Sequence, residues 1–175
     1  MLKVDLGQLA RKKRLQIDAD VPPDDALFKD AAFRMRGPLE IRLEAQTAGA
    51  HEVLVRGTLK GEAVLGCRRC LVDVGAPIRE EVALLFREGV SEAEAEAEEI
   101  YALPEKGNEL DLTHAIREHL VLAVPEFAIC RETCKGLCPS CGANLNETTC
   151  SCEPTTVDNR WAALLKIGKD KDGGT

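Results

Sequence analysis

Residues 130–152 read CRETCKGLCPSCGANLNETTCSC and contain six of the eight cysteines of this 175-residue chain. The other two form the pair Cys67-x2-Cys70. The eight cysteines therefore fall into four short pairs, and a tetrahedral zinc site commonly takes its ligands as two such pairs. Four pairs supply the ligands for two complete sites, so the spacing predicts a cysteine-rich zinc protein with two structural ions.

Other uses of closely spaced cysteines fit the chain less well. It starts at Met1 without an apolar signal segment, so we expect it in the cytoplasm, where thiols are normally kept reduced. This expectation favours metal over disulfides. An iron–sulfur cluster is a weaker alternative. A redox Cys-x2-Cys couple is weaker again, because no thioredoxin-like strand–helix pattern surrounds either pair.

The cysteines can be assigned to metal sites in two ways. The favoured scheme closes one site locally and forms the other between distant segments: Cys138, Cys141, Cys150 and Cys152 hold one ion, and Cys67, Cys70, Cys130 and Cys134 hold the other. The rival scheme builds a single zinc-ribbon site from Cys67, Cys70, Cys138 and Cys141 and leaves the other cysteines partly free. In either scheme four thiolates leave no open position for substrate or water, so the sites are expected to be structural.

Alternating apolar and polar residues predict a sheet in the first half of the chain. The pattern runs through Ile41, Leu43 and Ala45 and continues to Phe86, with turns expected at Gly49-Ala50, Gly57, Gly61 and Gly75. Residues 1–6 could add a strand. The Cys67–Cys70 pair would then lie in a turn between two strands of a small antiparallel sheet or open barrel.

Three segments are expected to be helical. Asp24 or Asp25 would cap a short helix reaching Met35, and Asp111 would cap a longer one that ends at Pro125. A third short helix would follow Asp158 and bring Trp161, Leu164 and Leu165 to one face. The predicted class is α+β, with a body over residues 1–129 and a zinc-stapled module over 130–175 packed on it.

The net charge of −7 is concentrated in one segment. Residues 88–109 contain eight glutamates and one lysine, and the rest of the chain is balanced. Such a low-complexity acidic run predicts a mobile loop. No apolar stretch approaches the roughly 20 residues of a membrane span. No phosphate loop, Gly-x-Ser-x-Gly or catalytic cysteine–histidine spacing is present, so neither an enzyme nor a small-molecule substrate is expected.

Several motifs together resemble one known family. They are CRRCL at 67–71, Asp111-Leu112 with the helix up to Pro125, the segment from Cys130 to Asn146, and Asp158-x-Arg160-Trp161-Ala162. In this order they are similar to the YceD family, the large ribosomal RNA subunit accumulation proteins of bacteria and plastids. The resemblance implies a role in ribosome biogenesis, in rRNA processing or early assembly of the large subunit.

The resemblance leaves two hypotheses about partners. In the first, the protein binds precursor ribosomal RNA or a large-subunit ribosomal protein through basic residues on its metal knuckles: Arg68, Arg69, Arg131 and Lys135. In the second, it is a zinc-stabilised protein-binding adaptor without RNA contact. Aromatic residues make up only 3% of the chain, so recognition of RNA shape and backbone is expected rather than base stacking.

Overall fold

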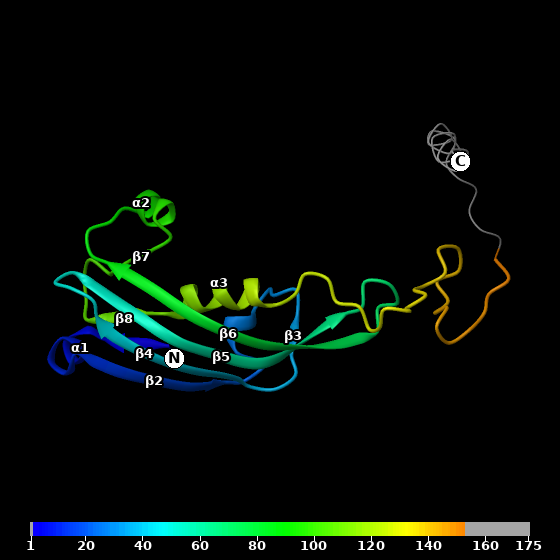
Figure 1. Ribbon diagram of the computed structural model, residues 1–175, viewed down its shortest axis with the longest axis horizontal. Coiled ribbons are helices and arrows are strands. Elements are labelled where there is room, and N and C mark those ends of the chain that lie inside the picture. Colours follow the sequence, from blue (N-terminus) through cyan, green and yellow to red (C-terminus); the bar gives the residue numbers. More distant parts are fainter. Residues whose placement is uncertain (1, 153–175) are drawn as a thin grey trace, which may run out of the picture.

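The computed structural model describes residues 2–152, and the helix expected after Asp158 lies outside them. Its main feature is an open sheet with strand order β2-β4-β5-β6-β7, in which β3 also pairs with β5. Figure 1 shows this sheet as a long curved layer that carries helix α3 on one side. The strands are β2 (Arg14–Val21), β3 (Arg34–Met35), β4 (Leu39–Thr47), β5 (Glu52–Gly66), β6 (Asp73–Arg87) and β7 (Tyr101–Ala102). All pairs in this sheet are antiparallel except β6 with β7.

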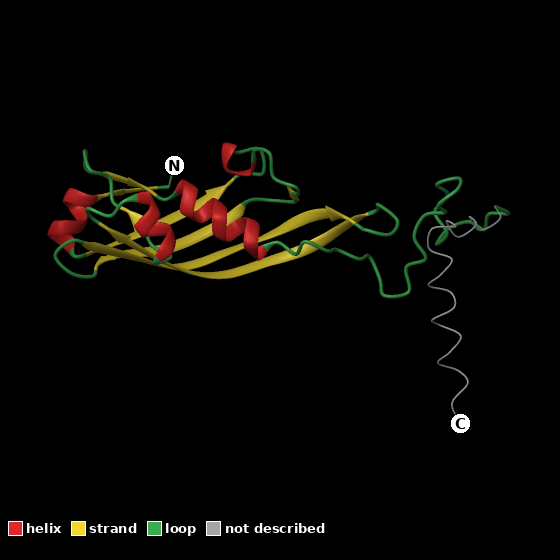
Figure 2. Ribbon diagram, turned by 90° about the horizontal axis from the view of Figure 1, so that it is seen from above, coloured by secondary structure: helices red, strands yellow, loops and turns green. Residues whose placement is uncertain are grey.

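The remaining elements cover the sheet or extend its ends. A second sheet joins β1 (Lys3–Asp5) to β8 (Glu109–Asp111). The helices are α1 (Leu6–Lys12), the 3-10 turn η1 (Ala26–Phe28), α2 (Glu92–Ala97) and α3 (Thr113–Ala123). Figure 2 shows α3 lying across one face of the strands. The α+β class and the strand near the N-terminus are therefore confirmed.

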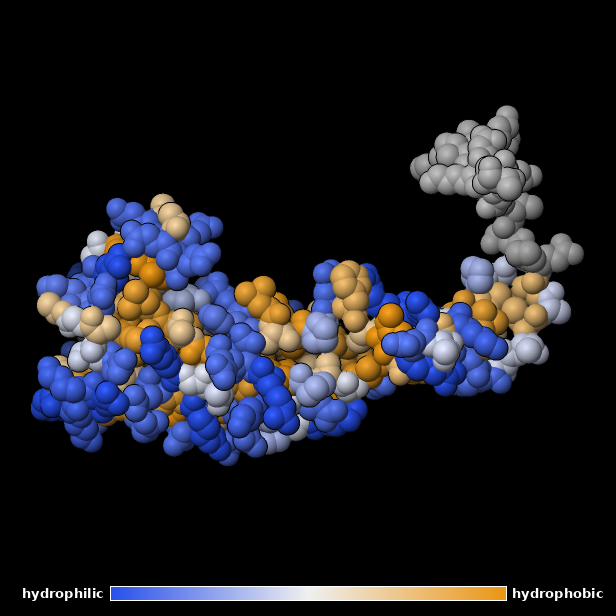
Figure 3. Space-filling view, viewed as in Figure 1, coloured by the Kyte–Doolittle hydropathy of each residue, from blue (hydrophilic) through white to orange (hydrophobic). Residues whose placement is uncertain are grey.

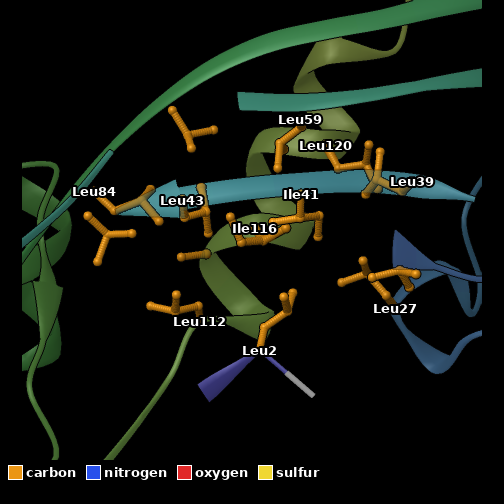
Figure 4. Close-up of a cluster of buried hydrophobic side chains, with 14 of the residues drawn as sticks. Leu2, Leu27, Leu39, Ile41, Leu43, Leu59, Leu84, Leu112, Ile116 and Leu120 are labelled. Carbon is orange, nitrogen blue, oxygen red and sulfur yellow. The ribbon is translucent and has the colours of Figure 1, made fainter. Parts of the chain in front are cut away.

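The core forms where the alternating pattern of the strands meets the apolar stripe of α3. In β4 every second side chain from Leu39 to Ala45 is buried, and Ile116 and Leu120 of α3 are fully enclosed. Figure 4 shows Ile41 of β4 beside Ile116 of α3, with Leu2 and Leu27 in the same cluster. The core contains no cysteine, since the hydrophobic cluster around the thiols is separate from the main one.

Strands β5 and β6 form a ribbon of fifteen paired residues, from Glu52 opposite Arg87 to Gly66 opposite Asp73. The turns predicted at Gly57, Gly61 and Gly75 are wrong, because all three glycines lie inside these strands. A side chain at Gly57 would overlap the backbone carbonyl of Arg42 on β4. That glycine is needed for the close approach of two strands rather than for a turn.

Two helix predictions need correction. Asp25 caps a helix as expected, and its carboxylate accepts the Leu27 N–H at 2.8 Å, but the helix is one 3-10 turn and ends well before Met35. The carboxylate of Asp111 accepts the Thr113 N–H at 2.8 Å at the start of α3, one position before the N-cap residue Leu112. The helix ends before Pro125, as predicted.

The acidic segment 88–109 has more structure than the loop we expected. Ser91 and Glu94 form a reciprocal capping box at the start of α2. Arg87 of β6 contacts Glu98 at 2.6 Å, and the phenol of Tyr101 donates to Glu118 of α3 at 2.8 Å. These contacts tie the segment to the edge of the sheet and to α3.

Candidate metal centres

The turn between β5 and β6 forms the first knuckle, which comprises residues 67–72. Its backbone closes tightly: the Cys67 N–H donates to the Val72 carbonyl at 2.8 Å, and the Leu71 N–H donates to the Cys67 carbonyl at 2.9 Å. The predicted position of this pair, in a turn between two strands, is confirmed. The knuckle therefore stands at the tip of the fifteen-residue ribbon, beyond the apolar core (Figure 1).

The segment after α3 runs alongside this knuckle. The Arg68 N–H donates to the Ala128 carbonyl at 2.9 Å, and the Cys130 N–H donates to the Cys67 sulfur at 3.4 Å. The Arg69 guanidinium donates to the carbonyl oxygens of Glu132 and Cys134, at 3.2 and 3.0 Å. Two segments about sixty residues apart in sequence are thereby held side by side.

Four sulfur atoms meet at this junction. Those of Cys67 and Cys134 are 4.0 Å apart, and those of Cys70 and Cys130 are 3.6 Å apart. All four lie within 4.8 Å of one another. We call Cys67, Cys70, Cys130 and Cys134 the first cysteine group.

These separations suit a shared ion rather than disulfides. A tetrahedral zinc with sulfur at about 2.3 Å places its ligands about 3.8 Å apart. A disulfide needs about 2.05 Å, and all eight cysteines are free. The first cysteine group can therefore hold a metal ion with only small adjustments of its side chains.

A second cysteine group forms within the following loop, from Cys138, Cys141, Cys150 and Cys152, whose sulfur atoms again lie within 4.8 Å of one another. Its knuckle, residues 138–143, closes through the Gly142 N–H to the Cys138 carbonyl at 2.9 Å. Cys138 is buried and the other three are more exposed. The structure thus assembles the two quartets that the sequence favoured, and within residues 2–152 it does not gather the rival set.

Asn146 links the two groups, and the sequence reasoning missed it. Its side-chain amide donates to the Cys134 sulfur at 3.4 Å, and its oxygen accepts the Lys135 N–H at 2.9 Å. The Leu145 N–H also bonds the Gly136 carbonyl at 2.9 Å. The loop that carries the second cysteine group is therefore fastened to a ligand candidate of the first, and the only hint in the sequence was an asparagine between cysteine pairs.

The thiols of the two groups differ in their tendency to ionise. Hydrogen bonds from the backbone amide of Cys130, and from the amides of Arg69 and Cys70 in the first knuckle, lower the pKa of Cys67 to about 6. The amides of Cys141 and its neighbour do the same for the pKa of Cys138, also to about 6. Desolvation raises the pKa of Cys130 to about 12, and hydrogen bonding with Cys141 does so for that of Cys152. Four such thiols cannot all ionise without a central cation, so binding a dication here would release protons.

The predicted basic contact residues divide into two types. Arg69 is exposed, but its guanidinium is engaged with the carbonyls of Glu132 and Cys134, so it positions the chain. Arg68, Arg131 and Lys135 are exposed and form no ion pair within residues 2–152. The Arg68 guanidinium carbon lies 3.7 Å from the centre of the Phe127 ring.

Leu71 is a further feature that the sequence did not reveal. It has a positive φ of 61° and is 69% exposed. Gly142 occupies the equivalent place in the second knuckle, with a φ of 73°. The two knuckles share one turn, and in the first of them a large side chain takes the place of the glycine that usually suits this conformation.

The histidines contribute to neither group. His51 pairs with Glu88 at 2.7 Å, and His114 lies 3.7 Å from Glu118 on the same helix. His119 lines a shallow hollow along α3. Within residues 2–152 no histidine belongs to a cluster that could hold a metal.

A family model described as "Large ribosomal RNA subunit accumulation protein YceD" matches residues 55–168, which include all eight cysteines. The chain belongs to the YceD family. The resemblance seen in the sequence is therefore confirmed. The description of this family concerns the RNA of the large ribosomal subunit.

The relatives of this YceD-family chain come from bacteria and plants. An uncharacterized protein of Mycobacterium tuberculosis is 32% identical over 139 residues, which cover 77% of this chain and 63% of the relative. The maize protein "Large ribosomal RNA subunit accumulation protein YCED homolog 1, chloroplastic" is 25% identical over 183 residues, which cover 89% and 62%. YlbN of Bacillus subtilis, also uncharacterized, is 25% identical over 92% of each chain.

This chain spans about 63% of the length of the mycobacterial relatives that it matches. No solved structure matches it. In residues 2–152, none of the helices combines the length and the apolar character that crossing a bilayer requires.

Proposed function

We propose that this YceD-family protein is a non-enzymatic, cytoplasmic ribosome-biogenesis factor. It would support the accumulation of large-subunit ribosomal RNA by binding precursor rRNA or a large-subunit ribosomal protein. Its two cysteine groups would each hold a structural zinc ion. The family description supports the process, and the geometry of the thiols supports the metal.

The observation that carries the proposal is the junction at the tip of the ribbon. There the first cysteine group joins the β5–β6 turn to the segment after α3, and the exposed cations Arg68, Arg131 and Lys135 lie on the joined segments. Side chains on a backbone held by an ion lose less entropy when they meet phosphate. Unpaired cations on a rigid support favour a polyanionic partner.

The donor sets support a structural rather than a catalytic role for the ions. Each group offers four sulfur ligands, and four thiolates fill a tetrahedral zinc. A hydrolytic zinc instead keeps one position for water and commonly uses histidine or carboxylate ligands. The arrangement therefore favours binding over chemistry.

One observation favours the alternative of a protein-binding adaptor without RNA contact. Exposed large hydrophobic side chains in residues 2–152 gather in the first knuckle and in the segment from α3 to Cys130: Leu71, Val72, Val121, Leu122, Phe127 and Ile129. Figure 3 shows hydrophobic side chains in view along this part of the molecule. Exposed apolar groups gathered in one region are typical of protein interfaces.

A salt titration tests the proposal. The zinc-loaded full chain is mixed with a labelled transcript of precursor large-subunit rRNA, and affinity is measured as salt rises. RNA binding by a few cations should weaken steeply, with a slope set by the phosphates neutralised. The triple variant Arg68→Ala, Arg131→Ala, Lys135→Ala should reduce both affinity and slope. A matched control, Arg11→Ala with Lys12→Ala, removes cations from α1 and should change neither.

The outcome in cells separates RNA accumulation from RNA binding. In a bacterium that lacks its own YceD-family gene, this chain should restore the ratio of large- to small-subunit rRNA, and the triple variant should not. Restoration by the triple variant together with an absence of RNA binding would favour the adaptor.

A further inference from the structure

Among the phenylalanines and the tyrosine of residues 2–152, only one ring is exposed. Phe28, Phe33 and Phe86 are buried, and Tyr101 is half-buried with its hydroxyl bound to Glu118. Phe127 is instead 56% exposed. It lies three residues before Cys130, on the segment that runs beside the first knuckle.

Phe127 already carries a stacked cation. The Arg68 guanidinium lies over its ring, 3.7 Å from the centre. The backbone fixes this pair, because the Arg68 N–H donates at 2.9 Å to the carbonyl of Ala128, the neighbour of Phe127. Cys67 and Cys130 of the same cysteine group flank the pair on the two segments. An exposed aromatic with a planar cation on it is a surface of the kind on which nucleobases stack.

Two exposed aliphatic side chains belong to the same two segments. Ile129 is 44% exposed, and Ala128, which lies between it and Phe127, is buried. Leu71, at the other end of the knuckle, is the exposed residue with positive φ. Its left-handed backbone is strained relative to glycine, and burial of its side chain within residues 2–152 does not compensate for this strain.

The charge around the pair suits a polyanion. Arg68, Arg131 and Lys135 have no carboxylate partner in the described part of the chain, although Glu126 and Glu132 are close in sequence. These cations therefore remain available for phosphate groups on either side of a stacked base.

We infer that Arg68 and Phe127 form a stacking platform for an unpaired base of single-stranded RNA. Leu71 and Ile129 pack against the adjoining sugar or base, and Arg131 and Lys135 contact phosphate. This inference rests on the proposed function, because it specifies the RNA partner. It also replaces the expectation that scarce aromatics argue against base stacking, since one exposed ring in the right place is enough for one base.

Binding to short labelled RNAs tests the platform. Fluorescence anisotropy of the zinc-loaded full chain is measured with fluorescein-labelled oligo(A) and oligo(U) of about 12 nucleotides, within the usual site size of single-strand binders. A duplex RNA of the same length serves as comparison. We expect the single strands to bind more tightly than the duplex.

The informative variants keep size or charge and remove the stacking surface. Phe127→Leu and Arg68→Lys should each weaken single-strand binding by about fivefold or more, because one stacked base contributes on the order of 1 kcal/mol or more. Arg68→Lys should leave the salt slope nearly unchanged, since the charge remains. The matched control is Leu122→Ala on α3, which removes a side chain that is 82% exposed and should leave RNA affinity unchanged. Zinc content and thermal melting verify that each variant folds.

The possible failures are distinguishable. Wild-type affinity in both platform variants, with steep salt dependence and no preference for single strands, would overturn the platform and leave the proposed RNA-binding function standing. No binding of the wild-type chain to any RNA would overturn both the platform and the RNA-binding form of the proposed function, and would favour binding to a protein partner. In that case Leu122→Ala and Phe127→Leu should both weaken the binding of a protein partner.

Discussion

The two cysteine groups use the same turn for different purposes. The first joins segments about sixty residues apart, and its Cys67 is completely buried. The second is confined to residues 138–152, and only its Cys138 is buried. An ion in the first group would therefore complete the fold of the ribbon tip, whereas an ion in the second would stiffen one loop. Similar spacing in sequence thus does not imply similar importance for stability.

Removing one sulfur from each group should expose this difference most strongly. Cys67→Ser should lose one zinc and destabilise the junction by on the order of 4 kcal/mol, because a cross-link over about sixty residues is lost. Cys141→Ser should also lose one zinc but leave the melting of the sheet unchanged. Metal analysis with thermal unfolding measures both effects. Equal shifts in melting would contradict the distinction between the groups.

Asn146 offers a way to couple the two groups or to separate them. Asn146→Ala removes the hydrogen bonds to the Cys134 sulfur and to the Lys135 N–H, each contributing about 1 kcal/mol. We expect the first group to lose zinc to a chelator several times faster, although the change lies in the loop of the second. Thr148→Ala, in the same loop, is the control. If only the second group releases zinc faster, the link has no effect.

The acidity of the two buried thiols predicts a pH effect that the groups share. The backbone amides lower the pKa of Cys67 and of Cys138 to about 6, below the value of about 8.5 for a free cysteine. Their contribution to the stability of the metal-free chain is therefore full above the free value and is lost as pH falls through about 6. Thiolate absorbance should show a step near pH 6 in the metal-free protein. Cys138→Ser should reduce the step, and a first transition near pH 8.5 would contradict the amide effect.

The smallest expected effect concerns the backbone strain at Leu71 in the first knuckle. Leu71→Gly gives the first knuckle the residue type found in the second and should raise stability by about 1 kcal/mol through relief of the left-handed backbone. Chemical denaturation of the zinc-loaded chain measures the change. The reference variant is Leu71→Ala, which shortens the side chain but keeps the strain. A loss of stability in Leu71→Gly would mean that Leu71 packs usefully within the protein.

Periodic and chemical signals made much of this molecule predictable. The alternation from Ile41 to Ala45 predicted a strand of the sheet, and the cysteine spacing predicted the two quartets that the structure assembles. Glycines were misleading because the same residue permits a turn or a close approach of strands, and only the neighbouring strand decides which. Gly57, lying against the Arg42 carbonyl, is the clearest case.

The finer features of the site depend on contacts across the chain. Leu71, Phe127 and Asn146 become meaningful only when residues 67–72, 127–134 and 144–146 lie together. Phe127 in particular carries no signal of its own in the sequence, since exposure is set by tertiary structure. The structure of the acidic segment was mispredicted for the same reason. It depends on Arg87, which precedes the segment, and on the pairing of Tyr101 with Phe86 of β6, and neither can be inferred from the segment's composition.

The length of the paired ribbon of β5 and β6 also sets how far the first knuckle lies from the other end of the sheet. Fifteen residues per strand at about 3.4 Å each make an arm of about 50 Å, at whose end the first knuckle is held. Side chains alternate between the two faces of the ribbon, so adding one residue to each strand would turn its tip over. Adding two residues to each strand lengthens the arm by about 7 Å and keeps the orientation of the tip. Insertions or deletions of that size would move the first knuckle nearer to or farther from the sheet while keeping its orientation.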